Sequence, residues 1–134
     1  SPTSVAVSQV RQGWEAAPRR FEALFDAIGR LVDEARAAIA RGMLNRLGLL
    51  MNEDQHLLRE LGVSSPPLET LIGAALGSGA KGAKLSGAGL GGNVIALVEP
   101  SAAGPVRQAL QAAGAAQTIL TEIAPCSSSS SAAR

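Results

Sequence analysis

Apolar residues recur every three or four positions between Pro18 and Arg41, and this spacing predicts one long amphipathic helix. Its apolar positions are Phe21, Leu24, Phe25, Ile28, Leu31, Val32, Ala35 and Ile39. Proline in the first turn and Gly42 just past the last turn are typical helix boundaries. A leucine-rich pattern of the same period runs from Leu44 to a stop at Gly62, so we expect an antiparallel helical hairpin with a short turn.

Shorter helices are predicted on both sides of this hairpin. The run Ser64-Ser65-Pro66-Pro67 combines a capping residue with prolines suited to a first turn, and it favours a helix that continues through Leu76. Near the start of the chain, the stretch from Val5 to Arg11 fits a strand by alternation or a helix by its length, and we favour the helix.

The pattern changes after Gly77-Ser78-Gly79, where short apolar runs on both sides of a glycine-rich stretch replace the helical period. We expect strands at 83–86 and 93–98 around a glycine loop, a helix at 102–113, and a last strand at 117–123. This β–β–α–β order predicts an α+β domain over residues 1–125, with helices covering an antiparallel sheet. The remaining residues, 126–134, are serine-rich and are predicted to be a disordered tail.

Composition and charge exclude several classes of function. Twelve basic and eleven acidic residues give a net charge of +1, and no basic block or set of stacking aromatics offers a nucleic-acid surface. No apolar run approaches the length of a membrane span, which argues against a membrane partner. A single cysteine, Cys126, excludes an internal disulfide and a cysteine-rich metal site. These observations favour a cytoplasmic protein of one domain.

Glycine occupies positions 87, 89, 91 and 92, and this loop is the main candidate for chemistry. A dinucleotide fingerprint requires a helix after the loop, whereas the residues that follow predict a strand. A Walker loop requires Lys and Ser or Thr directly after a glycine, and Gly92-Asn93-Val94 stands there instead. Two interpretations stay open: a hairpin whose amides approach a phosphate, and a purely structural tight bend.

Two stretches carry a resemblance to a known family. "MNEDQHLLRELGVSSPPLETLIGAAL" (51–76) and "GAKGAKLSGAGLGGNVIALVEP" (79–100) closely resemble the C-terminal domain of the galactokinase, homoserine kinase, mevalonate kinase and phosphomevalonate kinase (GHMP) superfamily, with most similarity to its mevalonate kinase branch. The resemblance extends over about Ser1 to Ile123. It implies a ferredoxin-like domain that closes a cleft for ATP, Mg²⁺ and a small hydroxylated substrate against a larger N-terminal domain, in isoprenoid precursor synthesis.

The same resemblance assigns the site residues. It places Lys84, Ser86, Gly87, Ala88, Gly89, Leu90, Gly91 and Gly92 at the ATP and substrate cleft, and Thr3 on the substrate side. Family members commonly carry glycine where Leu90 stands, which puts the choice of substrate in doubt. The family's main phosphate loop and its catalytic Asp and Lys belong to the N-terminal domain and have no match here. We therefore expect a C-terminal fragment without catalytic residues or a metal site, inactive alone and binding no cofactor tightly.

An alternative remains open, namely a free-standing ferredoxin-like module that binds an anionic metabolite or forms a homodimer. Other polar residues have simple interpretations. His56 is interpreted as a surface residue, Lys81 either steers phosphate or is a solvated lysine, and the pairs Asp33-Glu34 and Glu53-Asp54 are interpreted as solvated helix faces.

Overall fold

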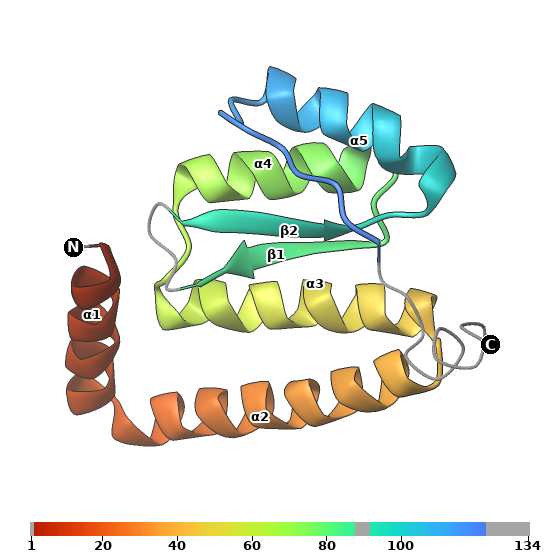
Figure 1. The fold of residues 1–134 in the computed structure, drawn as a ribbon. Coiled ribbons are helices and arrows are strands. Elements are labelled where there is room, and N and C mark those ends of the chain that lie inside the picture. Colours follow the sequence, from red (N-terminus) through yellow and green to blue (C-terminus); the bar gives the residue numbers. More distant parts are fainter. Residues whose placement is uncertain (1, 88–91, 123–134) are drawn as a thin grey trace.

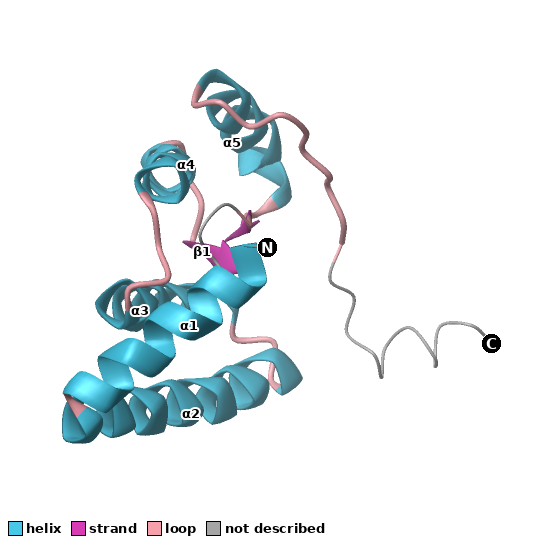
Figure 2. Ribbon diagram, turned by 90° about the vertical axis from the view of Figure 1, so that its left-hand side faces the viewer, coloured by secondary structure: helices cyan, strands magenta, loops and turns pink. Residues whose placement is uncertain are grey.

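The computed structural model describes residues 2–87 and 92–122. Within these ranges the elements are α1 (Pro2–Ala16), α2 (Pro18–Ala40), α3 (Leu44–Leu61), α4 (Pro66–Gly77), β1 (Gly82–Ser86), β2 (Asn93–Leu97) and α5 (Pro100–Ala112). The predicted α+β fold is confirmed, since an antiparallel strand pair is combined with helices. In Figure 1, α2 and α3 run side by side below the strands, and α4 and α5 lie above them. Figure 2 shows α3 and α4 on the same side of the strands.

The helical hairpin has the predicted boundaries. Gly42 and Gly62 follow α2 and α3 with φ values of 68° and 87°, in the left-handed region that favours glycine. Fewer apolar residues of α2 are buried than its sequence pattern predicts. Leu24, Leu31 and Ala38 are buried in core clusters that also contain residues of α3. By contrast, the next residue in each case, Phe25, Val32 and Ile39, is 42%, 43% and 53% exposed. We call these three residues the α2 seam.

Helix α3 lies directly along the edge of β1, because glycines occupy the point of closest approach. A Cβ atom on Gly82 would stand 2.3 Å from the carbonyl oxygen of Gly48, and one on Gly48 would stand 2.5 Å from that of Lys81. One and two turns further along α3, the side-chain oxygens of Asn52 and Gln55 accept hydrogen bonds from the backbone N–H groups of Ala83 (3.0 Å) and Leu85 (2.8 Å). The backbone N–H groups of β1 that do not bond to β2 are therefore hydrogen-bonded to side chains of α3.

Three clusters of buried side chains form the core. The first joins Ala6 of α1 to α2, α3 and Leu85 of β1, the second lies between α2 and α3, and the third joins α4 and α5 to Ala83 of β1. Ala83 and Leu85 are 0% and 2% exposed and point into this packing, while Lys84 and Ser86 alternate to the other face of the strand.

The predicted last strand at 117–123 is wrong over the residues that the structure describes. Residues 117–122 form no strand, and Ile119 and Leu120 are 81% and 61% exposed. The segment is attached instead by Arg107, whose Nε donates to Thr118 Oγ1 at 2.8 Å. A strand-like sequence forms a strand only beside a partner strand, and neither β1 nor β2 pairs with this segment. The serine-rich tail lies outside the described residues.

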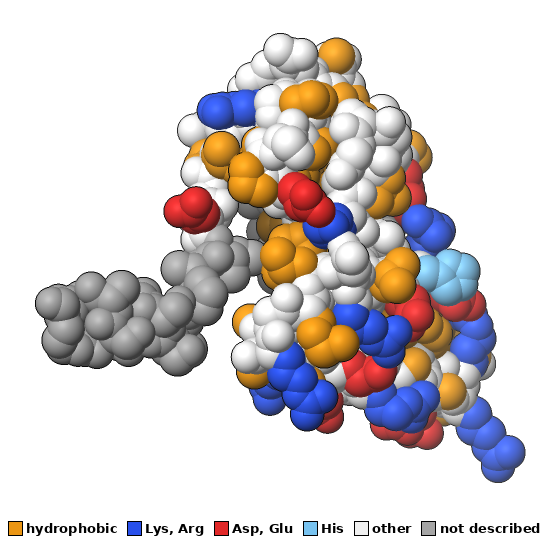
Figure 3. All heavy atoms as spheres, turned by 90° about the vertical axis from the view of Figure 1, so that its right-hand side faces the viewer, with side chains coloured by type: hydrophobic (Ala, Val, Ile, Leu, Met, Phe, Trp, Pro, Cys, Tyr) orange, Lys and Arg blue, Asp and Glu red, His pale blue; other side chains and the backbone are white. Residues whose placement is uncertain are grey.

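Other differences from the predicted elements are small. The first helix is longer than the stretch from Val5 to Arg11, and α5 begins at Pro100 rather than at residue 102. Ser65 occupies the N-cap position of α4, but its side chain makes no capping bond. On the face drawn in Figure 3, charges of both signs are interspersed over the lower half, with no large area of one sign. Across residues 2–87 and 92–122, the helices are too short or too polar to cross a membrane.

Candidate functional site

The glycine loop connects β1 to β2 in an antiparallel hairpin, as predicted. The strands pair from Gly82 with Leu97 to Ser86 with Asn93, so this last pair stands at the base of the loop. Gly87 has a φ of 80° and open space where a side chain would project. The expected glycine with positive φ is therefore confirmed, and a nucleotide fingerprint followed by a helix is excluded. The predicted site residues Ala88, Gly89, Leu90 and Gly91 lie outside the described residues.

Lys84 lies two residues before the base of the loop, on the same face of β1 as Ser86. Its Nζ donates to the backbone oxygen of Leu85 at 2.7 Å and lies 3.4 Å from Oδ2 of Asp54 in α3. The side chains of Lys84 and Asp54 are only 20% and 17% exposed. The other carboxylate oxygen of Asp54 is buried and has no hydrogen-bond partner among the described residues. The structure thus brings one predicted site residue into contact with a carboxylate.

The interpretation of Asp54 as part of a solvated helix face is wrong. Asp54 follows Leu50 by four residues and precedes Leu61 by seven, which places it on the buried stripe of α3. That spacing was visible in the sequence and is the signal that could have identified it. What the spacing did not reveal is that Lys84, thirty positions along the chain, would lie opposite.

A polar network under the strand fixes β1 from the side of α3 and α4. Gln55 is 2% exposed, and its Nε2 donates to Ser64 Oγ (3.1 Å) and to Glu69 Oε2 (2.8 Å), while its oxygen binds the N–H of Leu85. A hydrogen bond from Arg59 at 2.7 Å, supported by those from Ser64 and Gln55, lowers the pKa of Glu69. The strand that leads into the loop is therefore anchored by a charge-assisted network.

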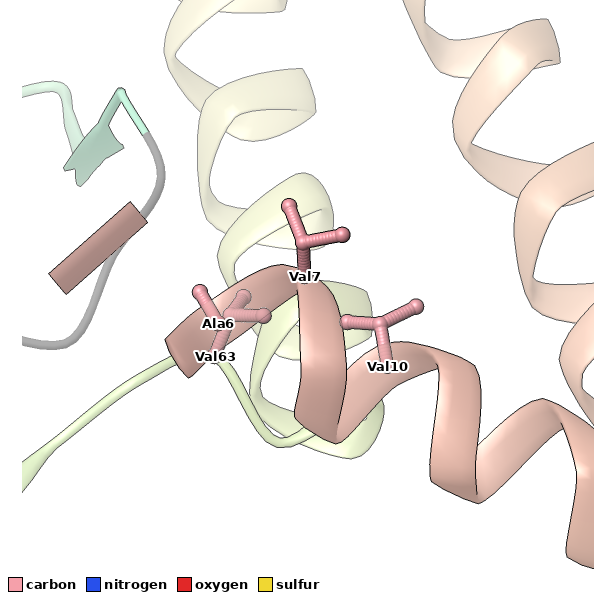
Figure 4. Close-up of a pocket in the computed structure, with 4 residues that line it drawn as sticks. All are labelled: Ala6, Val7, Val10 and Val63. Carbon is pink, nitrogen blue, oxygen red and sulfur yellow. The ribbon is translucent and has the colours of Figure 1, made fainter. Parts of the chain in front are cut away.

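Two hollows are lined by described residues. One has a volume of about 260 Å³ and runs between α2 and α3, with apolar walls that include Val32 and Met51 and with Asp54 and Lys84 among its lining residues. The other is apolar and lies between α1 and the chain after α3, where Figure 4 shows Ala6, Val7 and Val10 beside Val63. The predicted substrate-side residue Thr3 falls in the first turns of α1, and its side chain is not described.

Lys81 and His56 each lie beside a glutamate in the described part of the chain. Lys81 precedes β1, at the end away from the loop, and its Nζ lies 2.6 Å from Glu99 Oε1 and also contacts Asn45 Oδ1. The hydrogen bond that Lys81 donates to Glu99 lowers the pKa of Glu99. His56 is 66% exposed and lies 3.5 Å from Glu60. Over residues 2–87 and 92–122, no group of three or more His, Cys, Asp or Glu side chains could hold a metal ion.

The chain belongs to the GHMP kinases C terminal family, whose family model matches residues 35–116. This match covers the α2–α3 hairpin from its middle onward, both strands and α5.

Relatives within this family include several mevalonate kinases. That of Pyrococcus furiosus is 39% identical over 127 residues, which cover 91% of this chain and 37% of the relative. That of Aeropyrum pernix is 49% identical over 74 residues, or 55% of this chain and 23% of the relative. A crystal structure of L. major mevalonate kinase in complex with R-mevalonate superposes with a TM-score of 0.77 at 35% identity, covering 82% of this chain and 34% of that one. The chain thus spans about 37% of the first of these relatives.

Proposed function

We propose that this chain is the C-terminal domain of an ATP-dependent kinase that transfers a phosphoryl group to a hydroxyl of mevalonate or a closely related small alcohol, and that it acts in isoprenoid precursor synthesis in the cytoplasm. The observation that carries the proposal is the loop hairpin, with a left-handed glycine at its first position and an ammonium group two residues before its base. The similarity to mevalonate kinases over 91% of the chain supports the substrate class.

The residues present suit one part of such a reaction. Backbone N–H groups of a glycine loop can approach phosphate oxygens closely, because no side chain stands between them, and a nearby lysine adds positive charge. We assign these two roles to Gly87, which has nothing within 4 Å of its Cβ position, and to Lys84, in the middle of β1 and two residues before its last residue. Mg²⁺ bound with ATP would neutralise charge on the phosphates, and we assign no ligand for it to this chain.

Substitutions in the loop of the full-length protein test the proposal. Replacing Gly89 or Gly91 with valine should lower kcat/KM for ATP by about 100-fold, because the new side chain obstructs the approach of phosphate. The melting temperature should change by no more than about 3 °C, since Gly87 and Gly92, on either side of these positions, are exposed and lie outside the core. Gly73→Val is the matched control, because Gly73 lies in α4 with nothing within 4 Å of its Cβ position. Equal losses of activity and stability would mean that the loop is only structural.

The isolated chain of 134 residues tests whether this domain can bind ATP and transfer phosphate without the rest of the full-length protein. We expect it to fold, to bind ATP no more tightly than about 1 mM, and to release no ADP above an uncatalysed control. The reason is that phosphoryl transfer also requires groups that orient the acceptor, a proximity effect of about 7–11 kcal/mol. Calorimetric titration and a coupled ADP assay measure both quantities. Micromolar affinity or turnover would mean that this chain carries a complete site by itself, contrary to the proposal.

A further inference from the structure

Helix α2 carries a line of apolar side chains in which the exposed residues recur every seven positions. Phe25, Val32 and Ile39, the α2 seam, are 42%, 43% and 53% exposed, and Ile28 and Ala35 continue the same line as partly buried residues. The alternating spacing of three and four is that of the a and d positions of a coiled coil, where one helix packs along another. The line is about 21 Å long and belongs to the helix at the lower edge of the molecule in Figure 1. A continuous apolar line of this length indicates an interaction surface, unlike apolar residues that are exposed singly.

A hollow lies beside the α2 seam. Its volume is about 260 Å³, and Val32, Ala35 and Ile39 of α2 line it together with Met51 of α3. Ala35 has the smallest side chain of the apolar line, so a second helix that lies along α2 could place a large side chain there. Packed helices interdigitate in this way, with large residues of one helix opposite small residues of the other.

The charges that flank the α2 seam differ in sign between its two ends. Glu22 and Arg36 are two heptads apart, so they lie on the same side of the apolar line, at the position that follows each d residue. Both side chains are exposed, and within residues 2–87 and 92–122 neither forms an ion pair or a side-chain hydrogen bond. Charges at such positions set the choice and the orientation of a partner helix. An antiparallel copy of α2 would bring the acidic end of one helix to the basic end of the other.

We propose that the α2 seam is the docking surface for a second copy of this chain, in a two-fold dimer whose α2 helices pack antiparallel. In a two-fold contact, a residue that meets a second residue of the other copy is itself met in the same way, so every pair occurs twice. The register that places Glu22 opposite Arg36 also places Phe25 opposite Ala35, beside the hollow. One register thus satisfies both the charges and the packing. The opposed dipoles of antiparallel helices favour the same orientation.

Charge reversal tests the dimer without nucleotide or turnover, so the result does not depend on the proposed kinase function. Glu22→Arg places like charges opposite each other at both ends of the contact, and Arg36→Glu does the same with the other sign. Each variant alone should self-associate at least about tenfold more weakly than wild type in sedimentation equilibrium, because like charges across an interface oppose association. An equimolar mixture of the two variants should recover the dimer, since every pair in the mixed dimer is again of opposite sign. The double variant should recover it for the same reason.

Arg30→Glu is the matched control, because it makes the same change at an exposed position of α2 that lies away from the apolar line, and it should leave self-association unchanged. Circular dichroism verifies that each variant is folded. If a charge reversal unfolds the protein, Val32→Lys, at a position 43% exposed, replaces it and should give a monomer. The measurements are made on the full-length protein and on the 134-residue chain, and the full-length protein decides if the shorter chain does not fold.

Three results would overturn the inference. The first is a wild-type protein that stays monomeric at about 100 µM, a concentration at which a specific dimer is populated. The second is a mixture of the two charge-reversal variants that associates no better than either variant alone. The third is a full-length protein that stays monomeric while the 134-residue chain dimerises, which would mean that the rest of the protein covers the α2 seam.

Discussion

Replacing Gly48 with alanine should destabilise the protein, although alanine is the better helix former. Gly48 lies in α3 where the helix meets β1, and an added Cβ atom would be 2.5 Å from the carbonyl oxygen of Lys81, against at least 3.0 Å in real structures. The helix and strand must therefore separate by about half an ångström, as in an overpacked core. The hydrogen bond from Ala83 to Asn52, now 3.0 Å, would then stretch to the limit of hydrogen bonding.

The magnitude follows from opposing terms. Overpacking costs about 1–3 kcal/mol, and weakening hydrogen bonds to buried N–H groups adds about 1–3 kcal/mol. The gain in helix propensity returns only about 1 kcal/mol. We therefore expect the free energy of unfolding to fall by about 1–5 kcal/mol, against the 5–15 kcal/mol that is usual for a domain.

Urea denaturation followed by circular dichroism measures this loss, and Gly29→Ala is the control. Gly29 lies inside α2 with nothing within 4 Å of its Cβ position, so alanine should stabilise the protein there by about 0.5–1 kcal/mol. The two substitutions are chemically identical and should have opposite signs. If Gly48→Ala is as stable as wild type, the close approach of α3 and β1 does not constrain the fold and the reasoning is wrong.

Four further substitutions test the network and the packing. The pKa of Glu69 is lowered from its ordinary value of 4.5, so its stabilising effect should be full above pH 4.5 and lost as the pH falls through the lower folded pKa. The free energies of unfolding of Glu69→Gln and wild type, measured by urea denaturation, should therefore differ by about 1 kcal/mol at pH 7 and converge in acid. Gln55→Leu leaves the buried N–H of Leu85 unpaired and should cost about 2–3 kcal/mol in chemical denaturation. Ile119→Ser, at a position 81% exposed, should change the free energy of unfolding by less than about 0.5 kcal/mol. Leu68→Ala, at a position 2% exposed, should lower it by about 2–5 kcal/mol. Equal effects of the two substitutions in thermal unfolding would contradict the observed packing.

Local chemistry in the sequence determined most elements of this fold. The helical period of the first half predicted the hairpin, and glycines at 42 and 62 marked its ends because only glycine adopts their left-handed backbone easily. The β-branched run after the glycine loop likewise predicted a strand rather than a helix, which excluded a dinucleotide site. Each of these features depends on residues a few positions apart.

Only the tertiary structure decided what depends on distant partners. The sequence could not distinguish the buried residues of α2, such as Leu31 and Ala38, from the exposed residues of the α2 seam. Both sets are apolar, and α3 covers only the first. A strand-like segment at 117–122 stays unpaired because pairing needs a neighbouring strand edge as well as β propensity. The contact of Asp54 with Lys84 follows from the packing of α3 along β1, which Gly48 and Gly82 permit by leaving space for the two backbones to meet.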